Sequence, residues 1–242
     1  MVNLLNNDIE LIKKYVLKDK QERALKRLEN GEPVQYISGN VEFYNSIIDV
    51  NKNVLIPRFE TELLVDKTIK YLKDMFNKKI DIVDLGTGSG CIAISLKKAI
   101  DCNITALDIS KDALEVAKNN AIKNNVEIDF QEYDIAKPYN KIFDCIISNP
   151  PYIAKDAYIE QKVLDNEPNI ALFADDNGLY FYKKILDYSS KMLNNKSLIA
   201  FEIGDNQKEL LEDYINNNYK GINYKFEKDL TDRYRYLFIF NE

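Results

Sequence analysis

Short apolar runs alternate with stretches of helical periodicity along most of the chain. The runs at residues 80–85, 104–108 and 143–148 contain many β-branched residues, which is typical of strands buried on both faces of a parallel sheet. Apolar positions at helical spacing follow the first run, at residues 91–100. They also follow the second run, where Ser110 is a good N-terminal cap. Strands that alternate with helices in this way predict an α/β fold.

The pattern extends this fold toward the C-terminus. Further strands are predicted at residues 126–133, 197–203, 222–227 and 234–240, and further helices at residues 60–76, 179–193 and 206–219. No helix separates the last two strands, so we expect them to form an antiparallel hairpin. Together with the three runs named above, these strands predict a seven-stranded sheet that is mostly parallel.

The N-terminal part has a different pattern, which predicts two short amphipathic helices at residues 8–18 and 20–30. Strands are expected at residues 41–50, joined as a hairpin, and at 54–56, where Pro57 ends them. We therefore expect a helical segment over 1–32, a β-hairpin linker over 33–57 and a catalytic domain over 58–242. The helices either cover apolar surface or help to bind a substrate, and the hairpin is either a plain linker or a contact with ligand.

A glycine-rich turn directly follows the first strand of the predicted sheet, with the sequence Gly86-Thr87-Gly88-Ser89-Gly90. Glycines let the backbone approach a ligand closely, and the helix that follows leaves N–H groups pointing at it. An ordinary strand-to-helix turn is the alternative. A dinucleotide fingerprint would need a further glycine at the position of Cys91, so pyrophosphate binding is disfavoured.

Polar residues follow the neighbouring strands, at the edge of the sheet where open α/β folds bind ligands. Asp108 ends one strand and can accept both hydroxyls of a ribose, or it caps the helix that follows. Asp134 follows the next strand and is either a ligand contact or an ordinary loop acid, and Asp84 precedes the glycine turn. An adenosine without a pyrophosphate, bound among acids, indicates S-adenosylmethionine, whose sulfonium is positively charged.

Four motifs resemble one family when they are taken together and in order. They are residues 36–44 (Tyr-Ile-Ser-Gly-Asn-Val-Glu-Phe-Tyr), 56–62 (Ile-Pro-Arg-Phe-Glu-Thr-Glu), 84–90 (Asp-Leu-Gly-Thr-Gly-Ser-Gly) and 149–152 (Asn-Pro-Pro-Tyr). The chain resembles the PrmC/HemK family of peptide chain release factor glutamine methyltransferases over residues 33–242. The resemblance implies a Rossmann-like class I methyltransferase fold. It also implies S-adenosylmethionine as cofactor and, as substrate, the glutamine of the Gly-Gly-Gln motif in release factors.

The resemblance also implies roles for individual residues. Arg58, Glu60 and Thr61 are expected on the rim of the site, although Phe59 replaces the proline that is usual in the family. The family begins with a larger helical bundle, so we expect a shortened N-terminal part here. The cofactor is expected to contact Asp84, Gly86, Thr87, Gly88, Ser89, Gly90, Asp108, Asp134 and Asn149. Asp84 either contacts the methionine end of the cofactor or orients the glycine turn.

The motif at residues 149–152 predicts the chemistry. A glutamine amide is a poor nucleophile because its nitrogen lone pair is delocalised into the carbonyl. The side-chain oxygen of Asn149 and the carbonyl of Pro150, which Pro151 holds in place, can each accept one amide N–H. Tyr152 offers an aromatic face to the amide or to the sulfonium. We therefore expect Asn149, Pro150 and Tyr152 to act in catalysis, and these residues with Pro151 to bind the substrate.

Other functions remain open at this point. A glutamine in a ribosomal protein would need the same chemistry, and an adenine amino group in DNA is a more distant possibility because enzymes that methylate it share the Asn-Pro-Pro-Tyr motif. A DNA enzyme would also need a basic groove for the phosphates. The third alternative is an adenosine-binding module without catalysis, for which paired amide acceptors would be unnecessary.

Composition narrows these possibilities. A net charge of −6 disfavours direct nucleic-acid binding, and the absence of histidine removes His-dependent triads and His-ligated metals. The three widely spaced cysteines predict reduced thiols. With neither a signal peptide nor a membrane span in the sequence, we expect a cytoplasmic protein, and we expect it to be a monomer. The mixed segment 153–176 is a candidate lid or substrate groove.

Overall fold

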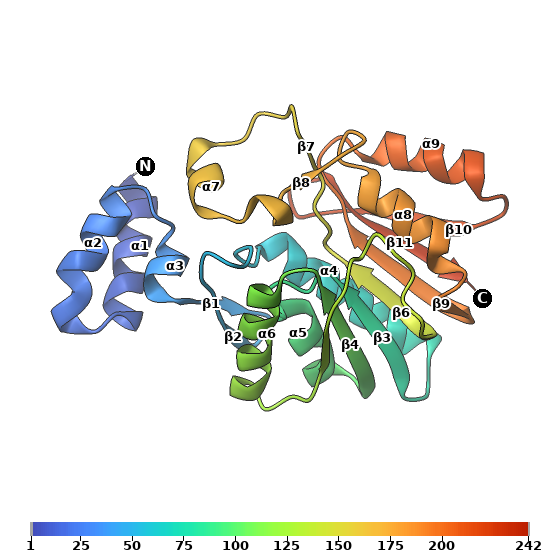
Figure 1. The fold of residues 1–242 in the computed structure, drawn as a ribbon, viewed down its shortest axis with the longest axis horizontal. Coiled ribbons are helices and arrows are strands. Elements are labelled where there is room, and N and C mark those ends of the chain that lie inside the picture. Colours follow the sequence, from blue (N-terminus) through green and yellow to red (C-terminus); the bar gives the residue numbers. More distant parts are fainter. Residues whose placement is uncertain (1, 242) are drawn as a thin grey trace.

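A computed structural model describes residues 2–241 as a twisted sheet covered by helices on both faces, with further helices to one side (Figure 1). The sheet has seven strands in the order β10-β11-β9-β6-β3-β4-β5. Their bounds are β3 Ile80–Leu85, β4 Cys102–Asp108, β5 Asp129–Glu132, β6 Phe143–Ser148, β9 Leu193–Glu202, β10 Asn223–Lys228 and β11 Tyr234–Asn241. Strand β11 pairs antiparallel with both β10 and β9, and the other pairs of this sheet are parallel. The predicted sheet and its closing hairpin are confirmed.

The central strands β3, β4 and β6 are almost entirely buried because both faces of the sheet are covered there. Ile82 belongs to the core on one face and the adjacent Val83 to the core on the other, as the period of a strand requires. Helices α4 (Phe59–Met75), α5 (Cys91–Ala99) and α6 (Lys111–Lys123) contribute to the first core. Helices α8 (Tyr180–Ser189) and α9 (Lys208–Asn218) contribute to the second. The three cysteines are buried and unpaired.

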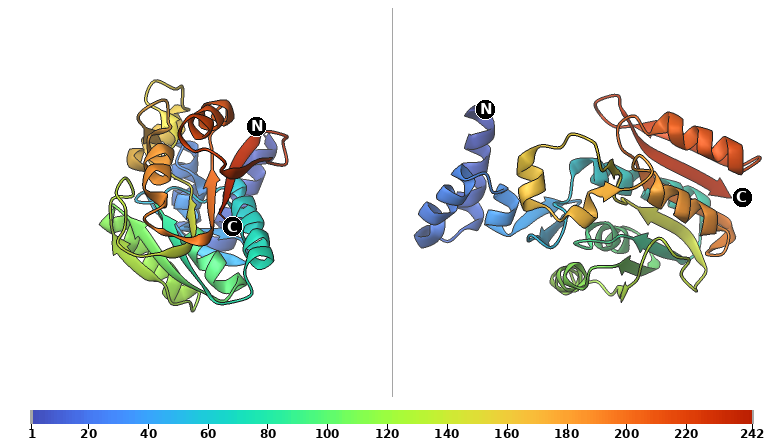
Figure 2. Two further views of the ribbon diagram at one scale, coloured as in Figure 1. Left: turned by 90° about the vertical axis from the view of Figure 1, so that its right-hand side faces the viewer. Right: turned by 45° about the horizontal axis from the view of Figure 1, so that its top comes forward.

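The N-terminal helices form a small unit with a core of its own. Helices α1 (Val2–Tyr15), α2 (Gln21–Glu29) and α3 (Val34–Ser38), with the short 3-10 turn η1 (Lys18–Lys20), stand beside the sheet domain (Figure 2). Among the described residues, the buried side chains of this core are Ile12, Ala24, Val34 and Ile37. Helix α3 lies in a stretch that the sequence pattern assigned to the hairpin linker. Its five residues are too few for a periodicity to be recognised.

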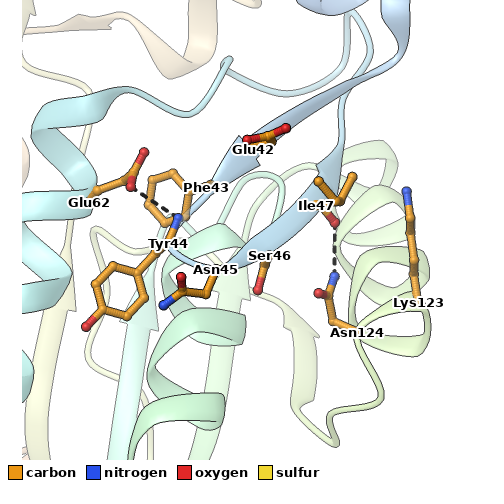
Figure 3. A pocket seen from close by; sticks show the side chains of 9 residues that line it. All are labelled: Glu42, Phe43, Tyr44, Asn45, Ser46, Ile47, Glu62, Lys123 and Asn124. Atoms are coloured by element: carbon orange, nitrogen blue, oxygen red, sulfur yellow. Dashed lines mark hydrogen bonds between the residues drawn. The ribbon is translucent and has the colours of Figure 1, made fainter. Parts of the chain in front are cut away.

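A two-stranded hairpin, β1 (Asn40–Phe43) with β2 (Ser46–Asp49), joins the helices to the sheet domain. Its backbone is bonded to the domain by side chains from α4 and α6: the backbone N–H of Tyr44 donates to Glu62, and Asn124 donates to the carbonyl of Ile47 (Figure 3). Lys14 and Tyr15 both reach the carboxylate of Glu42, at 2.8 and 2.7 Å. The hairpin is therefore bonded both to the sheet domain and to the N-terminal helices.

The prediction of a strand at residues 54–56 is wrong. Val54 and Ile56 are buried, but their backbone groups bond to a local turn and to side chains instead of a neighbouring strand, and the N–H of Val54 donates to the carbonyl of Asn51. The hydroxyl of Tyr36 donates to the carbonyl of Val54, and the N–H of Ile56 donates to Glu167. An apolar run indicates that its side chains are buried, but it does not show which groups form hydrogen bonds with its backbone.

The predicted loop at 153–176 contains short elements. These are β7 (Ile153–Ala154) paired in parallel with β8 (Phe173–Ala174), helix α7 (Gln161–Asn166) and the 3-10 turn η2 (Asn169–Ala171). Figures 1 and 2 show α7 on the side of the domain that faces the N-terminal helices. The segment therefore extends away from the sheet and returns to it.

Candidate active site

One cavity lies at the carboxyl ends of β3, β4, β5 and β6, where the sequence pattern placed the ligand. Four of the predicted site elements contribute to its wall: the glycine turn, the two strand-end carboxylates and the motif after β6. Apolar residues from the linker and from the segment 153–176 complete it. The lining residues are Asn53, Val54, Leu55, Gly86, Gly88, Asp108, Ile109, Ser110, Ala113, Asp134, Ile135, Asn149, Pro151, Pro168, Ile170, Ala171 and Phe181.

The glycine turn is bonded to the neighbouring strand. The N–H groups of Gly86 and Thr87 both donate to the carbonyl of Leu107 in β4, at 2.8 and 3.0 Å. Gly88 has a φ of +54°, and a side chain there would meet nothing within 4 Å, so its backbone faces open space. Gly90 has a φ of +81° and lies close to Ala117 of α6, where an added Cβ would come within 3.1 Å. The glycines therefore allow both the turn and the packing of α5 on α6.

Asp84 lies beneath the turn and is fully buried. The hydroxyl of Thr87 donates to its Oδ2 at 2.6 Å, while Oδ1 has no partner among the described residues. Removal from water raises the pKa of the Asp84 carboxyl to about 7, against the lowering effect of the Thr87 hydrogen bond. Asp84 is absent from the described lining of the cavity, and its bond to Thr87 joins it to the glycine turn.

Asp108 holds the edge of the cavity through two backbone bonds. Its Oδ2 accepts from the N–H of Gly88 at 2.8 Å and its Oδ1 from the N–H of Ser110 at 2.9 Å. Burial raises the pKa of Asp108, and the backbone donors oppose this shift. Ser110 itself caps α6 by accepting from Ala113, as predicted. Each oxygen keeps a second lone pair, so Asp108 can bond the backbone at the start of α6 and also accept hydroxyls of a ligand.

Asp134 follows β5 and reaches the same cavity from the next strand end. Its Oδ1 accepts from the N–H of Ala136 at 2.9 Å, and its Oδ2 lies 3.3 Å from Nζ of Lys137. Its side chain remains about one-third exposed. Asp134 is thus both a turn residue and part of the cavity wall.

The side chain of Asn149 forms a hydrogen bond through its NH₂ group. Its Nδ2 donates to the hydroxyl of Thr61 at 3.2 Å, and that hydroxyl donates to Glu202 at 2.7 Å. The bond leaves the side-chain oxygen of Asn149 for another donor. Burial raises the pKa of Glu202 to about 7, although Thr61 and nearby arginines favour its charged form.

The residues after Asn149 are fixed by contacts from distant parts of the chain. The side-chain amide of Gln207 donates to the carbonyl of Tyr152 at 2.9 Å and accepts from the N–H of Gly204 at 2.8 Å. Gly178 approaches the same carbonyl so closely that an added Cβ would lie 2.0 Å from it. Removal from water raises the pKa of Tyr152 well above its usual value, so its ring is a neutral face.

The carboxylate of Glu167 bonds the segment 153–176 to the residues before α4, next to the cavity. Glu167 is buried, accepts from Arg58 at 2.5 Å and from the N–H of Ile56 at 3.2 Å. The next residue, Pro168, lines the cavity with Ile170. The segment is therefore bonded directly to the stretch that precedes α4, which also contributes Val54 and Leu55 to the cavity wall.

Of the predicted site residues, Gly86, Gly88, Asp108, Asp134, Asn149 and Pro151 meet on the cavity, whereas Asp84, Thr87, Ser89, Gly90, Pro150 and Tyr152 are absent from its described lining. The pattern missed Glu167, Glu202 and Gln207. Glu202 ends an apolar strand as Asp108 does, so the same reasoning could have found it. Glu167 and Gln207 carry no local signal.

The residues around this cavity fit S-adenosylmethionine. Carboxylates at two adjacent strand ends can accept hydroxyls and favour a positive charge, and the open space at Gly88 leaves room for a ligand beside the turn. Val54, Leu55, Ile135 and Phe181 provide apolar surface for an aromatic base. No helix within residues 2–241 combines the length and apolarity that a membrane crossing requires.

Comparison with known proteins gives consistent results. Residues 59–169 match the methyltransferase small domain. The chain is 43% identical to the release factor glutamine methyltransferase of Flavobacterium psychrophilum over 86% of this chain and 75% of the relative. For the enzyme of Mycoplasma mycoides subsp. mycoides these values are 39%, 98% and 85%. A methyltransferase from Pyrococcus furiosus shares the fold, with a TM-score of 0.60 at 19% identity, over 93% of this chain and 99% of that one. The chain belongs to the family of release factor glutamine methyltransferases.

Proposed function

We propose that this chain transfers a methyl group from S-adenosylmethionine to the side-chain amide nitrogen of the glutamine in the Gly-Gly-Gln motif of peptide chain release factors. The observation that carries the proposal is the orientation of Asn149, whose oxygen is left free beside the cofactor cavity. The names and extent of similarity of the relatives support the choice of substrate. The release factors would be met in the cytoplasm by a monomeric enzyme.

The protein's part in the reaction is to present the amide nitrogen. Asn149 Oδ1 accepts one N–H of the substrate amide and the carbonyl of Pro150 accepts the other. Two acceptors at an angle hold the nitrogen and favour its pyramidalisation. Tyr152 supplies a neutral aromatic face. The bound cofactor supplies the electrophilic methyl group.

Holding both reactants in line supplies much of the rate enhancement, up to ~7–11 kcal/mol in favourable cases. No general base is needed before transfer, because the methylated amide loses its extra proton readily afterwards. Asp108 and Asp134 serve cofactor binding, the former through the ribose hydroxyls. The glycine turn, Gly86 to Gly90 with Thr87 and Ser89, shapes the backbone around the cofactor, and Asp84 orients that turn.

The first prediction tests this use of Asn149. Replacing Asn149 by Ala should lower the methylation rate by about 10²–10³, since one preorganised hydrogen bond is lost, while cofactor affinity changes much less. Labelled methyl incorporation into a release factor measures the rate, and calorimetry measures cofactor binding. Asn119→Ala, on the exposed face of α6, is the matched control. Near-normal turnover by Asn149→Ala would remove this residue from the proposed role.

Substrate choice is tested by mapping the methylated residue. The wild-type enzyme should label the Gly-Gly-Gln glutamine of an isolated release factor, located by mass spectrometry. A ribosomal protein and a DNA duplex are tested in parallel. Label on either of those, with none on the release factor, would replace the proposed substrate while leaving the methyltransferase assignment intact.

A further inference from the structure

A carboxamide has two ends of nearly the same shape and opposite hydrogen-bonding character. Turning the Asn149 side chain by 180° would exchange its oxygen and its NH₂ group. Only one orientation offers an acceptor to the N–H of a substrate amide. The other presents N–H to N–H, so an enzyme that uses Asn149 needs a means of selecting the orientation.

Two buried residues next to Asn149 make that selection possible. The hydroxyl of Thr61 has one proton, which it donates to Oε2 of Glu202 at 2.7 Å. With its proton used, this hydroxyl can only accept from Asn149, and Nδ2 of Asn149 lies 3.2 Å away. In its ionised form, which Thr61 and the nearby arginines favour, Glu202 can only accept and thus fixes the direction of both bonds. Thr61 and Glu202 are 3% and 2% exposed, so water does not replace either partner.

The three residues come from separate elements that the fold holds in register. Strands β6 and β9 are parallel neighbours with Ser148 opposite Phe201, so Asn149, the residue after β6, and Glu202, the last residue of β9, lie at the same edge of the sheet. Thr61 comes from the first turn of α4. The backbone carbonyl of Glu202 accepts from the hydroxyl of Tyr182 at 2.8 Å, which fixes the end of β9. The arrangement spans 141 residues of sequence.

We propose that Thr61 and Glu202 are positioning residues that set the orientation of the Asn149 carboxamide, so that its oxygen faces the substrate. The inference rests on the proposed use of Asn149 as an amide acceptor. Neither residue touches the substrate. Both act through Asn149.

Kinetics with purified full-length variants test this relay of hydrogen bonds, which runs from Glu202 through Thr61 to Asn149. Thr61→Val should lower kcat for release-factor methylation about tenfold, the equivalent of about one hydrogen bond, without a matching change in cofactor affinity. Thr61→Ser, which keeps the hydroxyl, should restore most of the rate. Thr68→Val is the control, because Thr68 is also buried in α4 but donates to the carbonyl of Leu64. Equal losses in Thr61→Val and Thr68→Val would overturn the proposal.

A double-mutant comparison separates positioning from general damage. If Thr61 acts only through Asn149, Thr61→Val should cause no further loss when Asn149 is already Ala. An additional tenfold loss in that background would assign Thr61 another role. Glu202→Gln should resemble Thr61→Val, because a side-chain amide at 202 can donate to Thr61 and release the Thr61 proton toward Asn149.

A measurement without substrate distinguishes failure of the relay from failure of the proposed function. In ¹⁵N-labelled protein, the Asn149 side-chain amide signals are identified by their absence in Asn149→Ala. They should shift in Thr61→Val and Glu202→Gln but remain in place in Thr68→Val. Unchanged signals would refute the relay whatever the enzyme methylates. Shifted signals in a protein that does not label release factors would keep the relay and reject only the substrate.

Discussion

Asp84 is a fully buried carboxyl with one oxygen unpaired among the described residues, and its pKa is raised from 3.8 to about 7. Between these values the folded protein holds a proton that the unfolded chain releases. The stabilising contribution of protonated Asp84 is therefore complete below about pH 4 and is lost as the pH rises through about 7.

Asp84→Asn should remove this dependence while keeping an acceptor for Thr87. Relative to wild type, the variant should gain up to about 1.4 kcal/mol of unfolding free energy for each pH unit between 4 and 7. Urea unfolding at several pH values across this range measures the difference. Parallel stability curves for the two proteins would show that Asp84 titrates normally.

Asp108, unlike Asp84, should affect the binding of the cofactor. Asp108→Ala removes an acceptor at the cavity edge and leaves the N–H groups of Gly88 and Ser110 without their partner. We expect the cofactor dissociation constant to rise about 10- to 100-fold, as for the loss of hydrogen bonds to a charged group. Calorimetry measures it. Asp112→Ala, exposed on α6, makes the same charge change and should bind normally. Unchanged affinity in Asp108→Ala would contradict the ribose assignment.

At the scale of elements, the Asn-Pro-Pro-Tyr loop depends on the turn before α8. Gly178 has a φ of +82°, and a Cβ there would overlap the carbonyl of Tyr152. Gly178→Ala should therefore displace the loop and lower the methylation rate at least tenfold. Gly221→Ala is a close control, because Gly221 has a similar φ of +73° but open space around it. Equal effects of the two substitutions on rate would show that backbone strain alone, and not the contact, is responsible.

The elements differ in how well the sequence predicts them. β3, the glycine turn and α5 were predictable because their signal is local: an apolar run, alternating glycines and small residues in order. The run at 54–56 misled because its backbone partners, Tyr36 and Glu167, lie far away in sequence. The pairing of Thr61 with Glu202 was not predicted because these residues are also far apart in sequence, although the strand-end position of Asn149 was evident. Local pattern predicts elements and strand ends, whereas long-range side-chain bonds require the fold.

For the whole molecule, separate cores imply separate stabilities. Ile12 is buried in the helical unit and contributes nothing to the two cores of the sheet. Ile12→Ala should cost about 2–5 kcal/mol within that unit. Hydrogen exchange should then quicken across α1, α2 and α3, with protection of β3 and β6 unchanged. A uniform loss of protection would mean that the helices and the sheet unfold as one.

The ion pair between Arg58 and Glu167 has a consequence for turnover. Spent cofactor leaves a cavity walled partly by Pro168 and Ile170, next to the carboxylate that is bonded to Arg58 and Ile56. Those two residues belong to the stretch that links the hairpin to α4, and α7 shares a groove with the end of α2. A displacement of the N-terminal helices that also moved α7 would therefore strain the contact of Glu167 with Arg58 and Ile56, beside the cofactor cavity. Through this one contact, binding of a large partner at the helices would be coupled to exchange of the small molecule in the cavity.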